Sequence, residues 1–198
     1  MKWFTSDLHF GHKNIIHLQN RPFTSVEAMD EEIISYWNKT VKKDDIVYII
    51  GDFSFYDYKK TKAIVERLVG RKILIRGNHD ERFDTRTFIN MGFWDVYNYA
   101  IIKVGGHRIV LNHYPYSQAW YKTLWKKLTK KYYPRWYGQF FLKDKGMNIL
   151  HGHNHSAPDN FYTTDKGATG INVAWDISNR FISEAEITRY LNDRPKKP

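Results

Sequence analysis

The sequence predicts one α/β domain in which two β-sheets pack together and helices lie on their outer sides. The first 80 residues alternate strand-like and helix-like segments, which favours an α/β core. The second half is richer in strand-like segments, which indicates a second sheet. With 198 residues the chain is long enough to bury a core, and we expect one domain over residues 1–193 and a disordered tail at 194–198.

Three apolar segments of the first half are expected to form strands, at residues 2–6, 46–50 and 72–76. Ser25 suits the N-cap of a helix that continues to about Thr40, because its hydroxyl can accept a hydrogen bond from a free backbone N–H. Asp57 is expected to start a second helix and Gly70 to end it. The predicted order is strand, helix, strand, helix, strand.

The second half is expected to consist mainly of strands. Residues 96–104 and 107–112 predict a hairpin that turns at Gly105 and Gly106. Residues 148–151 predict a short strand, and residues 171–175 and 185–191 are expected to close the sheets as further strands.

Residues 117–146 differ from the rest of the chain because lysine and arginine alternate there with many aromatic residues. We expect an insertion or cap that emerges beside the polar side chains at the strand ends. It could bind a nucleotide or nucleic acid through stacking and phosphate contacts. It could instead be a structural lid, or place residues 120–131 on a membrane surface as an amphipathic helix.

The composition restricts the class of protein. Lysine and arginine number 31 against 21 aspartates and glutamates, and the net charge of +10 favours an anionic partner such as a nucleotide or nucleic acid. An aromatic content of 17% excludes an intrinsically disordered chain. No apolar run approaches the roughly 18 residues of a membrane-spanning helix. Asp7 interrupts any secretory signal and cysteine is absent, so we expect a cytoplasmic protein whose metals are held by nitrogen and oxygen.

Polar side chains follow the predicted strands at five places. They are Asp7 with His9, Asp52, Asn78 with His79 and Asp80, His113, and His153 with His155. Because open α/β sheets bind ligands at the carboxyl ends of their strands, we expect these groups to converge. Without His79 and Asp80, seven ligands that share one carboxylate make two four-ligand sites, which suits a binuclear metal centre.

These motifs also resemble a known family. Asp7-Leu8-His9, Gly51-Asp52, Gly77-Asn78-His79-Asp80, His113 and Gly152-His153-Asn154-His155 occur in the order typical of calcineurin-like metallophosphoesterases. The resemblance is to the compact prokaryotic and phage members of that superfamily. It implies a four-layer α-β-β-α sandwich of two mixed sheets with flanking helices.

The resemblance implies a role for each motif residue. One metal ion would be held by Asp7, His9, Asp52 and His155, and a second by Asp52, Asn78, His113 and His153. His79 would protonate or stabilise the leaving oxygen, and Asp80 would hydrogen-bond its other ring nitrogen and keep the ring cationic. His12, Asn14 and Arg76 lie near these motifs in the sequence and are the further candidates for contact with substrate phosphate. The donor set suits Mn, Fe, Zn or Ni, and the family favours Mn²⁺.

The expected function is hydrolysis of a phosphodiester, derived from a nucleotide or nucleic acid, by in-line attack of a metal-bridging hydroxide. A phosphomonoesterase, including a protein phosphatase, is the alternative within the same chemistry. A non-catalytic metal-binding interaction scaffold is the alternative from another class. Preference for a monoester would favour the first alternative, and metal binding without turnover would favour the second.

Overall fold

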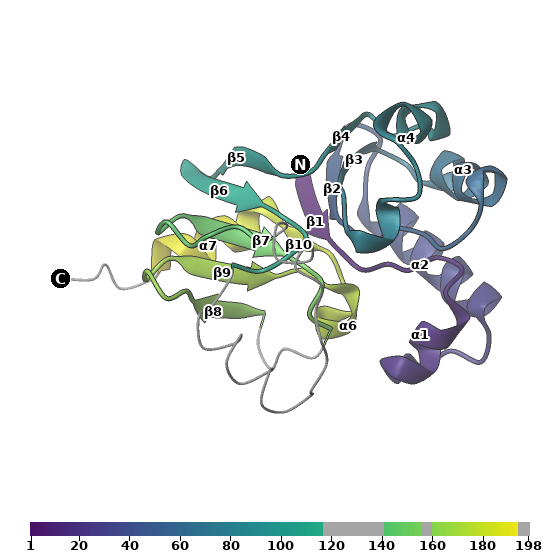
Figure 1. Ribbon diagram of the computed structural model, residues 1–198, viewed down its shortest axis with the longest axis horizontal. Helices are drawn as coiled ribbons and strands as arrows, with labels where there is room; N and C mark the ends of the chain where they lie inside the picture. Colours follow the sequence, from purple (N-terminus) through teal and green to yellow (C-terminus); the bar gives the residue numbers. More distant parts are fainter. Residues whose placement is uncertain (117–140, 156–159, 194–198) are drawn as a thin grey trace.

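The computed structural model describes residues 1–116, 141–155 and 160–193. Within these ranges the chain forms two five-stranded sheets that face each other (Figure 1). The first has the order β10-β1-β2-β3-β4, formed by Ile182–Ser183, Lys2–Thr5, Ile46–Ile50, Arg71–Ile75 and Asp95–Tyr97. The second has the order β5-β6-β7-β9-β8, formed by Ala100–Val104, His107–Leu111, Asn148–His151, Thr169–Asn172 and Phe161–Thr163.

Both sheets are mixed. Strands β1 to β4 are parallel, and β10 pairs antiparallel with β1. In the second sheet β6, β7 and β9 are parallel, whereas β5 and β8 are antiparallel edge strands. The expected fold class, two mixed sheets with flanking helices, is therefore confirmed.

Four helices pack on the outer side of the first sheet (Figure 1). They are α1 (Lys13–Leu18), α2 (Val26–Thr40), α3 (Tyr58–Arg67) and α4 (Thr85–Met91). The predicted caps are present: Ser25 Oγ accepts from the N–H of Ala28 at 3.1 Å, and Asp57 accepts from Lys60 N–H at 2.9 Å. Asp84 caps α4 in the same way, a helix that the sequence pattern did not indicate.

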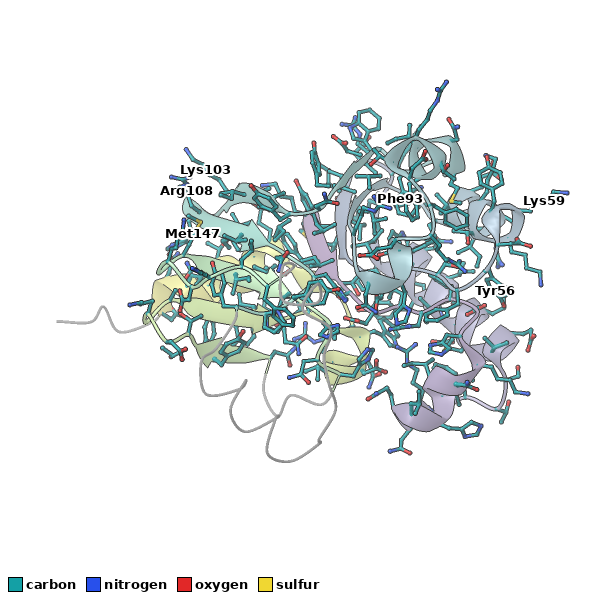
Figure 2. All side chains as sticks on the ribbon, in the orientation of Figure 1. Tyr56, Lys59, Phe93, Lys103, Arg108 and Met147 are labelled. Carbon is teal, nitrogen blue, oxygen red and sulfur yellow. The ribbon has the colours of Figure 1, made fainter. Side chains whose placement is uncertain are left out.

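Alternating side chains of the strands fill separate cores. Tyr48 and Ile50 of β2 point into the core between the sheets, while Val47 and Ile49 point to the helices. The inter-sheet core also receives residues from both sheets, among them Phe4, Ile73, Ile75, Ile109, Leu111, Leu150 and Ile171. Figure 2 shows Phe93 on the helical side of the first sheet and Met147 on the second sheet's side. Burial on both faces explains the near-continuous apolar composition of β2.

Three predicted strands differ from the structure. Residues 96–104 do not form one strand: β4 pairs with β3, and β5 pairs with β6 in the other sheet, so the chain crosses between sheets at this point. Residues 185–191 lie in a helix, α7 (Glu184–Asp193), in which Ile187 and Leu191 are buried four residues apart, as helical rather than strand periodicity requires. The strand at 171–175 ends at Asn172, and α6 (Trp175–Ser178) follows.

Most of the expected basic aromatic cap, and the whole of the expected tail, lie outside the described residues. Among the described residues, Tyr116, Leu142 and Met147 pack with Val110 and Ile149 on the outer face of the second sheet. No helix in the described ranges is long and apolar enough to cross a membrane.

Candidate metal centre

The loops after five strands converge where the carboxyl ends of the two sheets meet. Asp7, Asp52 and Asn78 follow β1, β2 and β3 of the first sheet. His113 follows β6, and His153 and His155 follow β7 of the second sheet. The structure brings these predicted residues together, and the site draws on both sheets.

The backbone of these loops is unusual. Asp7, His9, Asp52 and His153 all have positive φ angles, of 58°, 56°, 55° and 66°. A positive φ costs a non-glycine residue on the order of 1 kcal/mol and persists where the surroundings impose it. Hydrogen bonds hold each of these residues in place. Asp7 N–H donates to Gly51 O at 3.0 Å and His9 N–H to Asp52 O at 3.1 Å, while Asp52 N–H donates to the Asp80 carboxylate at 2.8 Å and His153 N–H to the Asp7 carboxylate at 3.0 Å.

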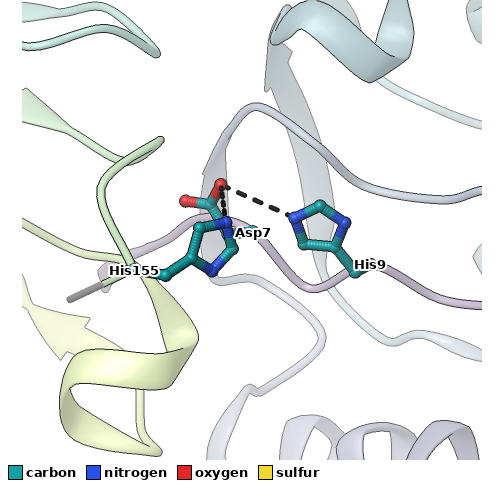
Figure 3. A group of neighbouring side chains, drawn as sticks. All are labelled: Asp7, His9 and His155. Carbon is teal, nitrogen blue, oxygen red and sulfur yellow. Dashed lines mark ion pairs between the residues drawn. The ribbon is translucent and has the colours of Figure 1, made fainter. Parts of the chain in front are cut away.

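One group of side chains surrounds Asp7 Oδ1. His155 Nε2 lies 3.4 Å from this oxygen and His9 Nε2 lies 3.8 Å from it, on two different sides (Figure 3). His9 Nε2 is also 3.8 Å from Asp52 Oδ2. These separations leave room for an ion between the donor atoms, which are close enough to share one.

A second group surrounds Asp52 Oδ2 and Asn78 Oδ1. His113 Nε2 lies 3.6 Å from the Asp52 oxygen. Asn78 Oδ1 is 3.2 Å from both His113 Nε2 and His153 Nδ1. Asp7, Asp52 and His113 also place ligand atoms close together, so Asp52 adjoins both groups.

The chemistry of this cluster fits a divalent cation. Asp7 Oδ1 and His9 Nε2 are buried and have no hydrogen-bond partner among the described residues. A buried polar atom without a partner is destabilising, and a bound cation would satisfy both atoms. The donors are imidazole, carboxylate and amide groups without a thiolate, a set that suits Mn, Fe, Zn or Ni.

Two imidazoles are oriented from behind. His113 Nδ1 lies 2.9 Å from the carbonyl oxygen of Ile50, and His155 Nδ1 lies 2.6 Å from Asp176 Oδ2. A proton on each Nδ1 atom satisfies these oxygens and leaves each Nε2 lone pair directed into the site, the arrangement that metal-binding histidines adopt.

Burial and neighbouring charges shift the protonation of the two central carboxylates. Burial raises the pKa of Asp52 to about 7, and the carboxylates of Asp7 and Asp80 add to the rise against the opposing charge of His113. Burial alone would also raise the pKa of Asp7, but the imidazoles of His9, His113 and His155 outweigh it and lower that pKa. Asp7 is therefore the persistent anion, whereas Asp52 takes up a proton as the pH falls through about 7 in the metal-free protein.

Comparison with known proteins decides the family. The calcineurin-like phosphoesterase model matches residues 3–179. The chain belongs to the calcineurin-like phosphoesterases. This membership supports metal-dependent hydrolysis of a phosphoester.

The relatives include small archaeal, phage and bacterial proteins. The uncharacterized protein MJ1445 of Methanocaldococcus jannaschii is 29% identical, over 96% of each chain. The Gene 66 protein of Mycobacterium phage L5 is 31% identical over 96% of this chain and 93% of its own. The crystal structure of AQ665 from Aquifex aeolicus, a protein of unknown function, is 28% identical with a TM-score of 0.66 and covers 96% of this chain and 98% of its own.

In the motif that follows β3, the structure differs from the expected hydrogen bond between Asp80 and the His79 ring. Asp80 does not hydrogen-bond the His79 ring: one of its oxygens accepts from Asp52 N–H and Gly77 N–H, each at 2.8 Å, and the other from Phe53 N–H at 3.1 Å. Asp80 is 2% exposed and ties the second loop to the third.

His79 is not held cationic by its surroundings. Burial lowers its pKa to about 4, and the nearby imidazoles of His12 and His113 add to this effect. The ring is 43% exposed and its Nε2 lies 3.9 Å from Asp52 Oδ2. The backbone N–H of His79 donates to Asp52 Oδ1 at 3.0 Å, which fixes the position of His79 beside the cluster.

The three residues expected to contact substrate differ in their surroundings. The Arg76 guanidinium donates through Nη2 to the carbonyls of Asp80, at 3.3 Å, and Phe83, and so supports the His79 loop. Asn14 is exposed on α1. His12 lies beside the cluster, with its Nδ1 3.3 Å from His9 Nδ1 and its ring stacked on Phe55 at 3.9 Å.

Arg21 and Asp176 adjoin the site and were missing from the sequence prediction. The residues before Asp176 were interpreted only as part of a closing strand, and nothing in the local pattern around Arg21 marks it. The signal that could have found Asp176 is its carboxylate, which comes directly after an apolar segment, as in the other motifs.

Proposed function

We propose that this chain is a phosphodiester hydrolase that uses two divalent metal ions, with Mn²⁺ favoured, on a substrate derived from a nucleotide or nucleic acid. The observation that carries the proposal is the cluster around Asp7 and Asp52, where two buried ligand atoms have no hydrogen-bond partner in the described part of the chain. Family membership supplies the reaction class, phosphoester hydrolysis.

The proposed ligands divide into two sets that share Asp52. Asp7, His9, Asp52 and His155 would hold one ion, and Asp52, Asn78, His113 and His153 would hold the other. A bound pair of ions supplies the positive charge that binds phosphate oxygens and lowers the pKa of a coordinated water. The two carboxylates offset only part of that charge, so an anionic substrate is favoured.

His79 is proposed to give a proton to the leaving oxygen. Its ring is partly exposed and lies beside the carboxylate that both ion sets share, so a phosphate held there would lie within its reach. The negative charge of a bound phosphate raises the pKa of a nearby imidazole, so with substrate bound the His79 ring would take up from water the proton that it lacks in the free site. An alkoxide leaving group needs this proton.

The preference for a nucleotide or nucleic-acid diester is supported by charge and composition. The net charge of +10 and the basic aromatic sequence of residues 117–146 suit an anionic substrate with bases to stack on. The ring centroid of Phe141, which belongs to the described end of that segment, lies 6.3 Å from that of His153, so this end of the segment adjoins the site. We therefore retain it as a proposed cap of a single domain over residues 1–193.

Hydrolysis of two chromogenic substrates tests the proposal. Enzyme treated with a chelator is assayed on bis-p-nitrophenyl phosphate and on p-nitrophenyl phosphate, before and after addition of Mn²⁺. We expect turnover that depends on Mn²⁺ and favours the diester. Faster turnover of the monoester would replace the proposal with a phosphomonoesterase, and binding of two ions without turnover of either substrate would favour a scaffold.

A further inference from the structure

Arg21 and Asp176 form a buried ion pair directly behind the proposed metal centre. The guanidinium meets the carboxylate through two atoms, Nε to Oδ1 at 2.6 Å and Nη2 to Oδ2 at 2.8 Å. The side chains are only 2% and 4% exposed. Arg21 follows α1 near the start of the chain, whereas Asp176 belongs to α6 near its end, so the pair joins distant parts of the sequence.

The same two side chains reach the metal-binding loops on both sides. Asp176 Oδ2 accepts from His155 Nδ1 at 2.6 Å. Arg21 donates through Nη2 to the carbonyl of Asp7 at 2.8 Å and through Nη1 to the carbonyl of Leu8 at 2.9 Å. One network therefore fixes the His155 ring and the backbone of the Asp7 loop, which belong to different sheets.

We propose that Arg21 and Asp176 are positioning residues that hold His155 and the Asp7 loop in the orientation that binds the first metal ion. The inference rests on the proposed function, since it assumes that His155 and Asp7 are ligands. A carboxylate behind a metal-binding imidazole fixes the ring and makes it a stronger ligand, and loss of such a partner weakens metal affinity by about 10- to 100-fold. Lysine cannot replace Arg21, because it lacks the planar fork that serves two carboxylate oxygens and two carbonyls together.

The network acts on one ion set more than on the other. His113, in the second set, is oriented by the carbonyl of Ile50 and not by this pair. His9, in the first set, has the ring of His12 beside its Nδ1, at 3.3 Å. Among the proposed ligands of the first ion, His155 is thus the imidazole whose Nδ1 meets a described carboxylate. The loss of metal affinity in the variants should therefore be concentrated at the first ion.

The test measures Mn²⁺ binding by titration calorimetry on the wild type, Asp176→Asn and Arg21→Lys. Asp45→Asn is the matched control, because Asp45 is also a buried carboxylate that accepts several hydrogen bonds, from the N-terminal amine, Trp3 and Lys42, but it precedes β2 at the opposite end of the sheet. Thermal unfolding of the metal-free proteins reports folding, and the visible absorption spectrum after Co²⁺ loading reports the geometry of each site.

We expect one of the two Mn²⁺ affinities to fall by about 10- to 100-fold in Asp176→Asn and Arg21→Lys, with an altered Co²⁺ spectrum. Asp45→Asn should keep both affinities and the spectrum even where its stability falls. Wild-type affinities and spectrum in a folded Asp176→Asn or Arg21→Lys protein would overturn the inference while leaving the proposed function intact. If Asp176→Asn does not fold, Arg21→Lys decides alone. A wild type that binds no Mn²⁺ would overturn both the proposed function and this inference.

Discussion

Asp52 and His113 face each other from different sheets, with the imidazole Nε2 3.6 Å from the carboxylate Oδ2. Asp52 follows β2 of the first sheet and His113 follows β6 of the second. The cluster is therefore complete only when the two sheets are packed, and the core between them, which is formed by apolar residues of both sheets, also fixes the geometry of the site.

Replacement of Asp52 by asparagine should remove most metal binding and hydrolysis. The substitution keeps the shape of the side chain but removes the charge that both proposed ion sets share. We expect the Mn²⁺ affinity to fall by more than about 100-fold, which is the upper range when a group that hydrogen-bonds a metal ligand is mutated. Asp57→Asn is the control, because asparagine caps a helix as well as aspartate does. Wild-type Mn²⁺ stoichiometry in Asp52→Asn would contradict the assignment.

Replacement of His79 by alanine should lower the hydrolysis rate without loss of metal. His79 lies beside the cluster, but the two proposed ion sets do not include it. We expect kcat on a diester with a poor leaving group to fall by about 10²- to 10⁴-fold, the range for loss of a general acid. Elemental analysis of the purified variant should show unchanged Mn²⁺ content, and loss of metal would refute the proposed role.

Metal affinity should depend on pH through Asp52. Burial raises the pKa of this carboxyl to about 7 in the metal-free protein, so below that pH a proton occupies the group and must leave before an ion binds. The Kd for Mn²⁺ should therefore be at least about tenfold higher at pH 6 than in the plateau above pH 8, because each pH unit below a ligand's pKa costs about a factor of ten, and the raised pKa values of His113 and His155 add to the dependence. Titration calorimetry at these pH values checks this, and a Kd that does not change would contradict it.

Replacement of Asp80 by asparagine should mainly affect stability. Its two oxygens accept three backbone N–H groups, and an amide can present only one oxygen to them. At least one buried N–H then faces an NH₂ group, so we expect the free energy of unfolding to fall by about 1–3 kcal/mol. Urea denaturation of the metal-free protein measures this. If Asp80→Asn keeps the wild-type free energy of unfolding but shifts the pH profile of hydrolysis, Asp80 would instead have the role expected from the sequence, which is to hold the His79 ring cationic.

The sequence was sufficient to locate the residues of the cluster but not all of their contacts. Strand patterns place Asp7, Asp52, Asn78, His113 and His153 at strand ends, and the carboxyl ends of neighbouring parallel strands meet in space. The contact between Arg21 and Asp176 joins residues 155 positions apart, which no local pattern reveals. Asp80 was misjudged for the same reason: two of its three partners, Asp52 and Phe53, lie on another loop, brought close by parallel pairing of β2 and β3.

The sequence also did not predict the type or the pairing of two segments whose apolar pattern fits more than one structure. Ala185 to Leu191 contains apolar residues that fit either a strand or a helix, and packing of Ile187 and Leu191 against both sheets decides for the helix. The change of sheet between β4 and β5 depends on which strands pair, and the mostly apolar segment from Val96 to Val104 does not indicate those partners.

Anomalous diffraction from a crystal grown with Mn²⁺ tests the central claim most directly. The account predicts two Mn²⁺ peaks about 3.5–4 Å apart, the spacing of a two-metal hydrolytic site. One peak should lie among Asp7, His9 and His155, the other among Asn78, His113 and His153, with Asp52 between them. A single peak, or ions bound away from Asp52, would contradict the two-ion centre on which the proposed reaction depends.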